Sequence, residues 1–158
     1  MMHLAPTADL SGDRFRMARP AAQLRLGYLV SQYPAVSHTF IYREIVALRK
    51  SGATILTSSV NLPDRPANQL PECERVEADG VFYIKATPAL RIGAAIIRTL
   101  FSRPRGFFAG LATAFNHGFS NPSEFFRWCG YFGEAVIVGD RLRSQGFHRL
   151  HVHFATEV

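Results

Sequence analysis

The sequence predicts an α/β fold, a Rossmann-like parallel sheet with helices on both of its faces. Two observations support this. A strand, a helix and a second strand follow one another within residues 24–60, as in a parallel βαβ unit. A further strand, "HRLHVHFA", comes at 148–155 after a long helical stretch. With 158 residues, 47% of them hydrophobic, the chain is long enough for one domain with a substantial core.

The opening βαβ unit is the most clearly marked part of the chain. "LRLGYLVS" (24–31) is apolar on both alternating faces, which is typical of a buried parallel strand. The helical stretch 39–52 then places three apolar side chains on one stripe: Ile41, Ile45 and Leu48. Gly52 fits the position just after the end of that helix. "ATILTSSV" (53–60) is rich in β-branched residues and is expected to form the second strand.

The remaining elements are expected in this order: a long polar loop over 61–79, a short strand over 81–86, helices over 88–101 and 104–117, a third helix to about residue 144, and a fourth strand over 148–155. The third helix has the clearest start. Asn121 can cap it, Pro122 takes the first helical position, and Glu124 completes a capping box. Gly146 marks its end.

The two ends of the chain and its cysteines bear on its location. Residues 1–22 are expected to be a flexible tail, since they lack the continuous apolar core of a signal peptide; the domain covers 23–158. No run of about 18 apolar residues predicts a membrane span. Cys73 and Cys129 lie in unlike surroundings without metal-binding spacing, which favours a reduced, cytoplasmic protein.

The formal charge of +6 is concentrated in one segment. Residues 85–130 carry a single acidic residue, Glu124, against six basic ones: Lys85, Arg91, Arg98, Arg103, Arg105 and Arg127. This excess has two explanations of equal weight. It indicates either an acidic partner or a solvated helix face that happens to be rich in arginine.

The loop after the first strand, "QYPAVSHTF" (32–40), should face the ligand crevice of an open α/β sheet. It lacks the G-x-G-x-x-G pattern of a dinucleotide site. Ser37, His38 and Thr39 can instead bind a polyhydroxylated or anionic ligand beside the helix N-terminus. The alternative is that Ser37 or Thr39 simply caps the helix.

Two stretches resemble bacterial GT-B glycosyltransferases of the glycogen-synthase-like retaining group, of the type that builds colanic acid and other exopolysaccharides. Residues 28–55 are similar to the family pattern P-x-x-S-E-T-F-I followed by E-I-x-x-L-x-x-x-G. The matching positions are Pro34, Ser37, Thr39, Phe40, Ile41, Glu44, Ile45, Leu48 and Gly52. His38 departs from the pattern, which usually has glutamate there. Residues 151–155 are similar to the family's H-x-H-F-A segment, so the resemblance covers about 24–158.

The resemblance implies transfer of a sugar from a nucleotide-sugar to a lipid-linked or saccharide acceptor in exopolysaccharide or cell-surface glycan synthesis. The chain would be the acceptor-side, N-terminal half of a GT-B fold, incomplete, with the nucleotide-sugar domain possibly on a separate chain. It is therefore expected not to turn over alone. The resemblance implies no cofactor and leaves the catalytic residues unassigned. The expected substrate-binding residues are Ser37, His38, Thr39, Glu44, His153 and Phe154.

The resemblance also gives the basic segment a role. Phenylalanines lie among its arginines, and basic and apolar side chains together suit peripheral docking on the anionic inner face of the membrane. The expected membrane-facing residues are Arg91, Arg98, Arg103 and Arg105. The alternative places the phenylalanines in the core, which is expected for about half of them.

The histidines near the end of the chain raise the question of a metal. His151 and His153 are two residues apart on a strand and therefore face the same side. A metal site would need a third ligand, such as His117 or Asp140. No recognised metal-binding spacing is present, and GT-B enzymes generally need no metal for their chemistry. No metal is expected, and the pair is interpreted as structural or crevice-lining.

Two other classes of protein compete with the transferase. A nucleic-acid-binding module would suit the pI of 9.9, but the arginines and aromatics form no recognisable binding motif, so no nucleic-acid partner is expected. A non-enzymatic membrane-surface or scaffold protein would keep the fold without turnover.

Overall fold

The computed structural model describes residues 24–119 and 122–153, and its centre is a four-stranded sheet in which all strands are parallel. The strands are β1 (Arg25–Gln32), β2 (Thr54–Asn61), β3 (Phe82–Tyr83) and β4 (Leu150–His153), in the spatial order β3-β2-β1-β4. The predicted Rossmann-like α/β fold is confirmed. No helix in these residues is long and apolar enough to cross a membrane.

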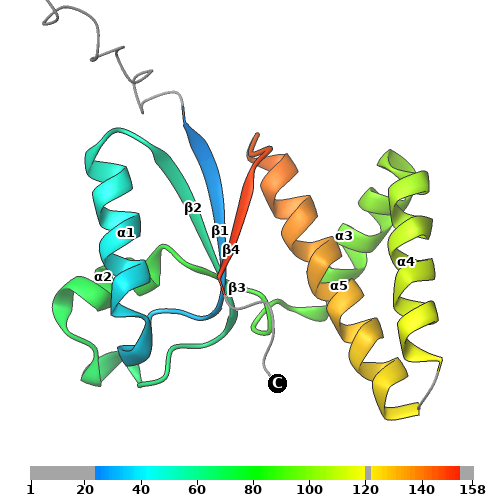
Figure 1. The fold of residues 1–158 in the computed structure, drawn as a ribbon, viewed down its shortest axis with the longest axis horizontal. Helices are drawn as coiled ribbons and strands as arrows, with labels where there is room; N and C mark the ends of the chain where they lie inside the picture. The colour runs from blue at the N-terminus through cyan, green and yellow to red at the C-terminus, as the bar shows by residue number, and fades with distance from the viewer. Residues whose placement is uncertain (1–23, 120–121, 154–158) are drawn as a thin grey trace, which may run out of the picture.

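Helices cover both faces of the sheet (Figure 1). One layer holds α1 (Thr39–Lys50) and α2 (Glu72–Asp79); the other holds α3 (Ala89–Ser102), α4 (Pro104–Gly118) and α5 (Pro122–Ser144). In the second layer α5 lies next to the sheet, and α4 is outermost. Short 3-10 turns, η2 (Val36–His38) and η3 (Ala67–Gln69), complete the chain. Asn121, the expected cap of α5, lies outside the described residues.

The segment between β2 and β3 differs from the prediction of a continuous polar loop. It contains η3 and the helix α2. Glu72 and Glu74 stand in the first turn of α2, where carboxylates interact favourably with the helix dipole. Glu77 pairs with Arg49 of α1, and this ion pair holds α2 against α1. Composition alone did not show that acidic residues would build a helix here.

The third strand is shorter than the predicted 81–86, since only Phe82–Tyr83 pair as a strand. The chain then turns away at Thr87, whose amide donates to the Ile84 carbonyl, and Pro88 precedes α3. A proline disfavours continued ladder bonding because it has no N–H.

Alternation along β1 divides the core between the two faces. Tyr28 and Val30 point toward α1 and pack with Ile41 and Ile45. Leu29 points to the other side, where it borders a second cluster: Ile137, Val138 and Leu142 of α5, with Phe147 after that helix and Ile84 after β3. The period of two in a strand produces this division.

The order of the strands creates a topological switch point beside β1. The chain steps outward from β1 to β2 and β3, and then returns through α3, α4 and α5 to β4 on the other side of β1. In open α/β sheets, ligands bind outside the carboxyl ends of the strands at such a point. This edge is therefore the expected place of a ligand site.

Candidate ligand-binding site at the carboxyl ends of the strands

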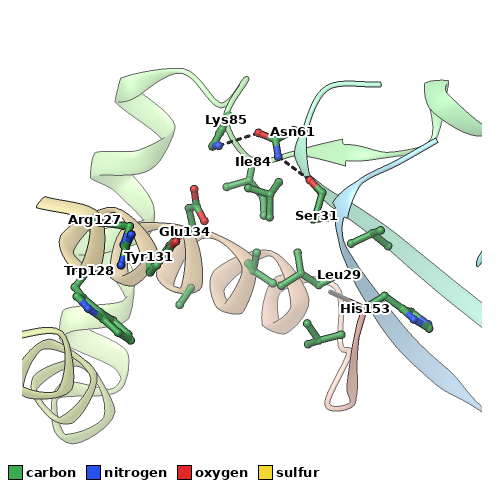
Figure 2. Close-up of a pocket in the computed structure, with 15 residues that line it drawn as sticks. Leu29, Ser31, Asn61, Ile84, Lys85, Arg127, Trp128, Tyr131, Glu134 and His153 are labelled. Carbon is green, nitrogen blue, oxygen red and sulfur yellow. Dashed lines mark hydrogen bonds between the residues drawn. The ribbon is translucent and has the colours of Figure 1, made fainter. Parts of the chain in front are cut away.

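A cavity of about 520 Å³ opens at the carboxyl edge of the sheet, on the face covered by α5 (Figure 2). The strand ends and the turn after β3 supply Ser31, Asn61 and Lys85, and α5 supplies Trp128, Tyr131 and Glu134. Apolar residues of β1, β2 and α5 form its base. This volume and this mixture of apolar walls with a few polar groups are typical of small-molecule sites.

A chain of hydrogen bonds links the polar groups of three neighbouring segments. The Lys85 Nζ donates to Asn61 Oδ1 at 2.8 Å, and Asn61 Nδ2 donates to the Ser31 carbonyl at 2.9 Å (Figure 2). These bonds fix the orientation of the Asn61 amide. An ammonium carries three donors, so Lys85 keeps donors for a ligand oxygen at the mouth of the cavity.

The opposite wall is aromatic. Trp128 stacks on His117 of α4, with ring centroids 4.7 Å apart, and Tyr131 meets Trp128 edge-on at 5.8 Å. Such contacts hold the two aromatic side chains in place. The cavity therefore offers a positioned aromatic wall across from a polar rim.

Glu134 is the acidic group of the cavity. Burial raises the pKa of its carboxyl, and the charge of Lys85 partly opposes the shift. The net effect is a carboxyl that accepts a proton more readily than an ordinary glutamate. It can exchange hydrogen bonds with a ligand hydroxyl as acceptor or, when protonated, as donor.

The three predicted loop residues lie at the same edge, but they do not line this cavity. The Thr39 hydroxyl donates to the Val36 carbonyl at 2.8 Å, and His38 Nδ1 lies 2.7 Å from the Gln32 carbonyl oxygen. Neither Ser37 nor Thr39 caps α1, because Thr39 is its first residue and His38 occupies the cap position without a side-chain cap bond. The expectation that one of them is the cap is wrong.

Asp64, from the loop after β2, satisfies the start of η2 instead. Its Oδ2 accepts a hydrogen bond from the Val36 amide at 2.8 Å. Burial alone would raise the pKa of Asp64, but this bond and the neighbouring Arg65 outweigh it and hold the pKa below its usual value. A residue distant in sequence therefore does the capping.

Glu44 and His153 come together on the α1 face of the sheet. Glu44 Oε2 lies 3.5 Å from His153 Nε2, and the Tyr28 hydroxyl donates to Glu44 Oε1 at 2.8 Å. The ring of Phe40 meets His153 edge-on at 6.2 Å. His153 also borders the cavity. Phe154 lies outside the described residues.

The predicted membrane-facing arginines are all exposed, and Arg91 lies in the first turn of α3. Arg98 forms an ion pair at 2.7 Å with Asp140 of α5. Arg103 and Arg105 lie where α3 turns into α4, beside Phe101 and Phe108, which are 81% and 57% exposed. Not all the phenylalanines of this segment are outside, since the half-buried Phe107 packs against Phe132 at 5.1 Å.

Of the predicted site residues, His153 lines the cavity, and the polar and aromatic residues of its walls were not predicted. Asn61 and Lys85 could have been found, because each is a polar residue following an apolar strand near the carboxyl edge. Trp128, Tyr131 and Glu134 could not, since their place depends on how α5 packs after a long crossover.

Comparison of the chain with models of protein families, with curated proteins and with solved structures finds no match. The resemblance to glycosyltransferases stays a prediction from two short motifs.

Proposed function

We propose that this domain binds the saccharide acceptor of a glycosyltransferase, with the sugar held in the cavity at the switch point. The observation that supports this most directly is the pairing of a fixed aromatic wall, Trp128 and Tyr131, with a polar rim, Asn61, Lys85 and Glu134. A pyranose ring has an apolar C–H face and a belt of hydroxyls. The two sides of the cavity complement these two features.

The charges at the mouth favour an acceptor that carries phosphate. Lys85 and Arg127 both line the cavity, and Arg127 also pairs with Glu124. Cationic side chains bind phosphate oxygens strongly. A lipid-linked sugar, in which a diphosphate joins the sugar to a polyprenyl chain, would place its sugar against the aromatic wall and its phosphates at the mouth.

Such an acceptor is anchored in a membrane by its polyprenyl chain. The outer helical layer offers a surface suited to contact with that membrane. The α3–α4 corner, defined by Phe101, Arg103, Arg105 and Phe108, presents two aromatic and two basic side chains that are all exposed. Apolar and cationic groups together favour the surface of an anionic bilayer. The proposed location is the inner face of the membrane, by peripheral contact.

Binding can be followed without a label, because Trp128 is the only tryptophan of the chain and lies in the cavity. We expect its fluorescence to change on titration with a polyprenyl-diphosphate-linked hexose, and Tyr131→Ala to weaken that binding by about tenfold, the loss of one aromatic contact face. Phe126→Ala is the matched control, since Phe126 is an aromatic of the same helix that is 75% exposed and outside the cavity. Equal affinity of the Tyr131→Ala and Phe126→Ala variants would show that the sugar does not bind in this cavity.

Transfer is a separate measurement. Holding donor and acceptor in reacting geometry is worth about 7–11 kcal/mol of the barrier, so a domain that holds only the acceptor should not catalyse transfer. We expect the 158-residue chain to bind acceptor without multiple-turnover transfer from a nucleotide-sugar, and transfer to appear when a nucleotide-sugar-binding partner is added. Multiple turnover by the chain alone would overturn the assignment as an acceptor-side domain.

A further inference from the structure

We propose that Glu44, His151 and His153 form a binding site for a divalent transition-metal ion, with Zn²⁺ as the best-suited ion. One donor atom from each residue lies within 4.8 Å of the other two. The site is on the α1 face of the sheet, at the carboxyl end of β4, whereas the cavity opens on the α5 face; His153 is the one ligand that also borders the cavity. It does not depend on the proposed sugar-binding function.

Two of the three donor-atom separations are close to those in a tetrahedral site. Zn²⁺ binds nitrogen and carboxylate oxygen at about 2.0–2.2 Å, so two ligands of one ion lie about 3.3 Å apart. The two histidine Nε2 atoms are 2.9 Å apart, and His153 Nε2 is 3.5 Å from Glu44 Oε2. Rotation of the Glu44 and His151 side chains, which are open to solvent, can adjust the remaining separation.

The protons of the two imidazoles also favour a cation. At 2.9 Å there is room for only one proton between the two Nε2 atoms, so at least one of them presents a lone pair. In the tautomers that carry the proton on Nδ1, both Nε2 lone pairs are available to a cation beside the Glu44 carboxylate. A cation there would replace the repulsion between these electron pairs with coordination bonds.

A buried side chain orients the carboxylate. Tyr28 is 1% exposed, and its hydroxyl donates to Glu44 Oε1, which leaves Oε2 turned to His153. Parallel pairing of β1 with β4 sets Tyr28 opposite His151 and Val30 opposite His153, so both imidazoles lie on the same face as the phenol. Hydrogen bonds to a ligating carboxylate are the usual second layer of a metal site.

The third ligand is not one of the two that the sequence suggested. His117 stacks on Trp128, and Asp140 pairs with Arg98, both in the layer that holds α3, α4 and α5. Glu44 takes that place from α1. A set of two histidines and one carboxylate leaves the fourth position of Zn²⁺ to water or a ligand. The Glu44 side chain is 42% exposed, so the site is open to solvent.

The test is a Zn²⁺ titration of the untagged full chain by calorimetry, with Co²⁺ absorption as a second readout of tetrahedral coordination. We expect one ion per chain and a metal-dependent rise in the melting temperature. Glu44→Gln and His153→Ala should each weaken binding at least tenfold, and Tyr28→Phe, which keeps the buried ring, should weaken it by about tenfold. His148→Ala is the control, an exposed histidine just before β4 that does not belong to the cluster.

Three outcomes would overturn the site. One is the absence of binding heat with excess Zn²⁺. The second is unchanged Zn²⁺ affinity in the His153→Ala variant, which would place the ion elsewhere on the chain. The third is loss of affinity in the His148→Ala control equal to that in His153→Ala. Circular dichroism of each variant separates a lost ligand from a lost fold, and Glu44→Gln, which conserves shape, serves if His153→Ala does not fold.

Discussion

Replacing Ile45 with alanine is expected to lower the free energy of unfolding by about 2–5 kcal/mol. Ile45 is 0% exposed and packs from α1 into the cluster formed by Tyr28, Val30 and Ile41. Those neighbours belong to the sheet and to the same helix, so they cannot move in to fill the lost volume. The variant therefore loses the transfer free energy of three carbons and leaves a cavity as well. Urea denaturation followed by circular dichroism measures the change.

Ile97→Ala is the matched control, since it removes the same atoms from a position in the middle of a helix whose side chain faces solvent. Ile97 is 57% exposed on α3, and a surface change of this kind should alter the free energy of unfolding by no more than about 0.5 kcal/mol. Equal losses in the two variants would contradict the layer arrangement, because Ile97 would then also have to be a core residue.

The part of the fold that the sequence predicted is the part governed by local periodicity. Ile41, Ile45 and Leu48 recur at helical spacing, and α1 buries the first two of them. Alternation in β1 gave a strand buried on both faces, with Tyr28 on one side and Leu29 on the other. These patterns depend only on the geometry of one element, so they can be read without knowing its neighbours.

The parts that were missed depend on contacts between distant segments. The helix α2 is held by Glu77 pairing with Arg49, a contact that no pattern within 61–79 reveals. In the same way, Asp64 from the loop after β2 accepts the Val36 amide of η2, whereas the hydroxyl cap expected for α1 is not formed. Glutamate by itself favours helices, but the three prolines of 61–79 indicated a loop, and the tertiary partner of Glu77 is not visible in the local sequence.

The candidate sites show the same limit. A period of two placed His151 and His153 on one face, and the structure agrees. That Glu44 meets them follows from the pairing of β4 with β1 and from the seat of α1 over that pair, neither of which is encoded in local spacing. Likewise, Trp128 reaches the cavity only because α5 crosses the ends of the strands (Figure 2).

The second large effect is expected at the membrane. Reversing the charges at the α3–α4 corner with Arg103→Glu and Arg105→Glu should weaken binding to anionic vesicles by at least about thirtyfold. Each arginine near an anionic surface contributes about 1 kcal/mol, and two of them about 2 kcal/mol. Adding Phe101→Ser should weaken vesicle binding by a further factor of about ten. Phe101 is 81% exposed, and its insertion would bury most of a phenyl ring. Vesicle sedimentation over a range of salt concentrations measures both losses.

The control keeps the net charge of the double variant and moves the change to the other layer. Arg43→Glu and Arg75→Glu alter exposed arginines of α1 and α2, on the opposite face of the sheet from the corner (Figure 1). If attraction came only from the overall charge of +6, both double variants would lose affinity equally. A local docking surface predicts a much larger loss for the corner variant, together with binding that weakens as salt screens the contact. Equal losses, or wild-type binding to neutral vesicles as strong as to anionic ones, would remove the corner as the membrane contact.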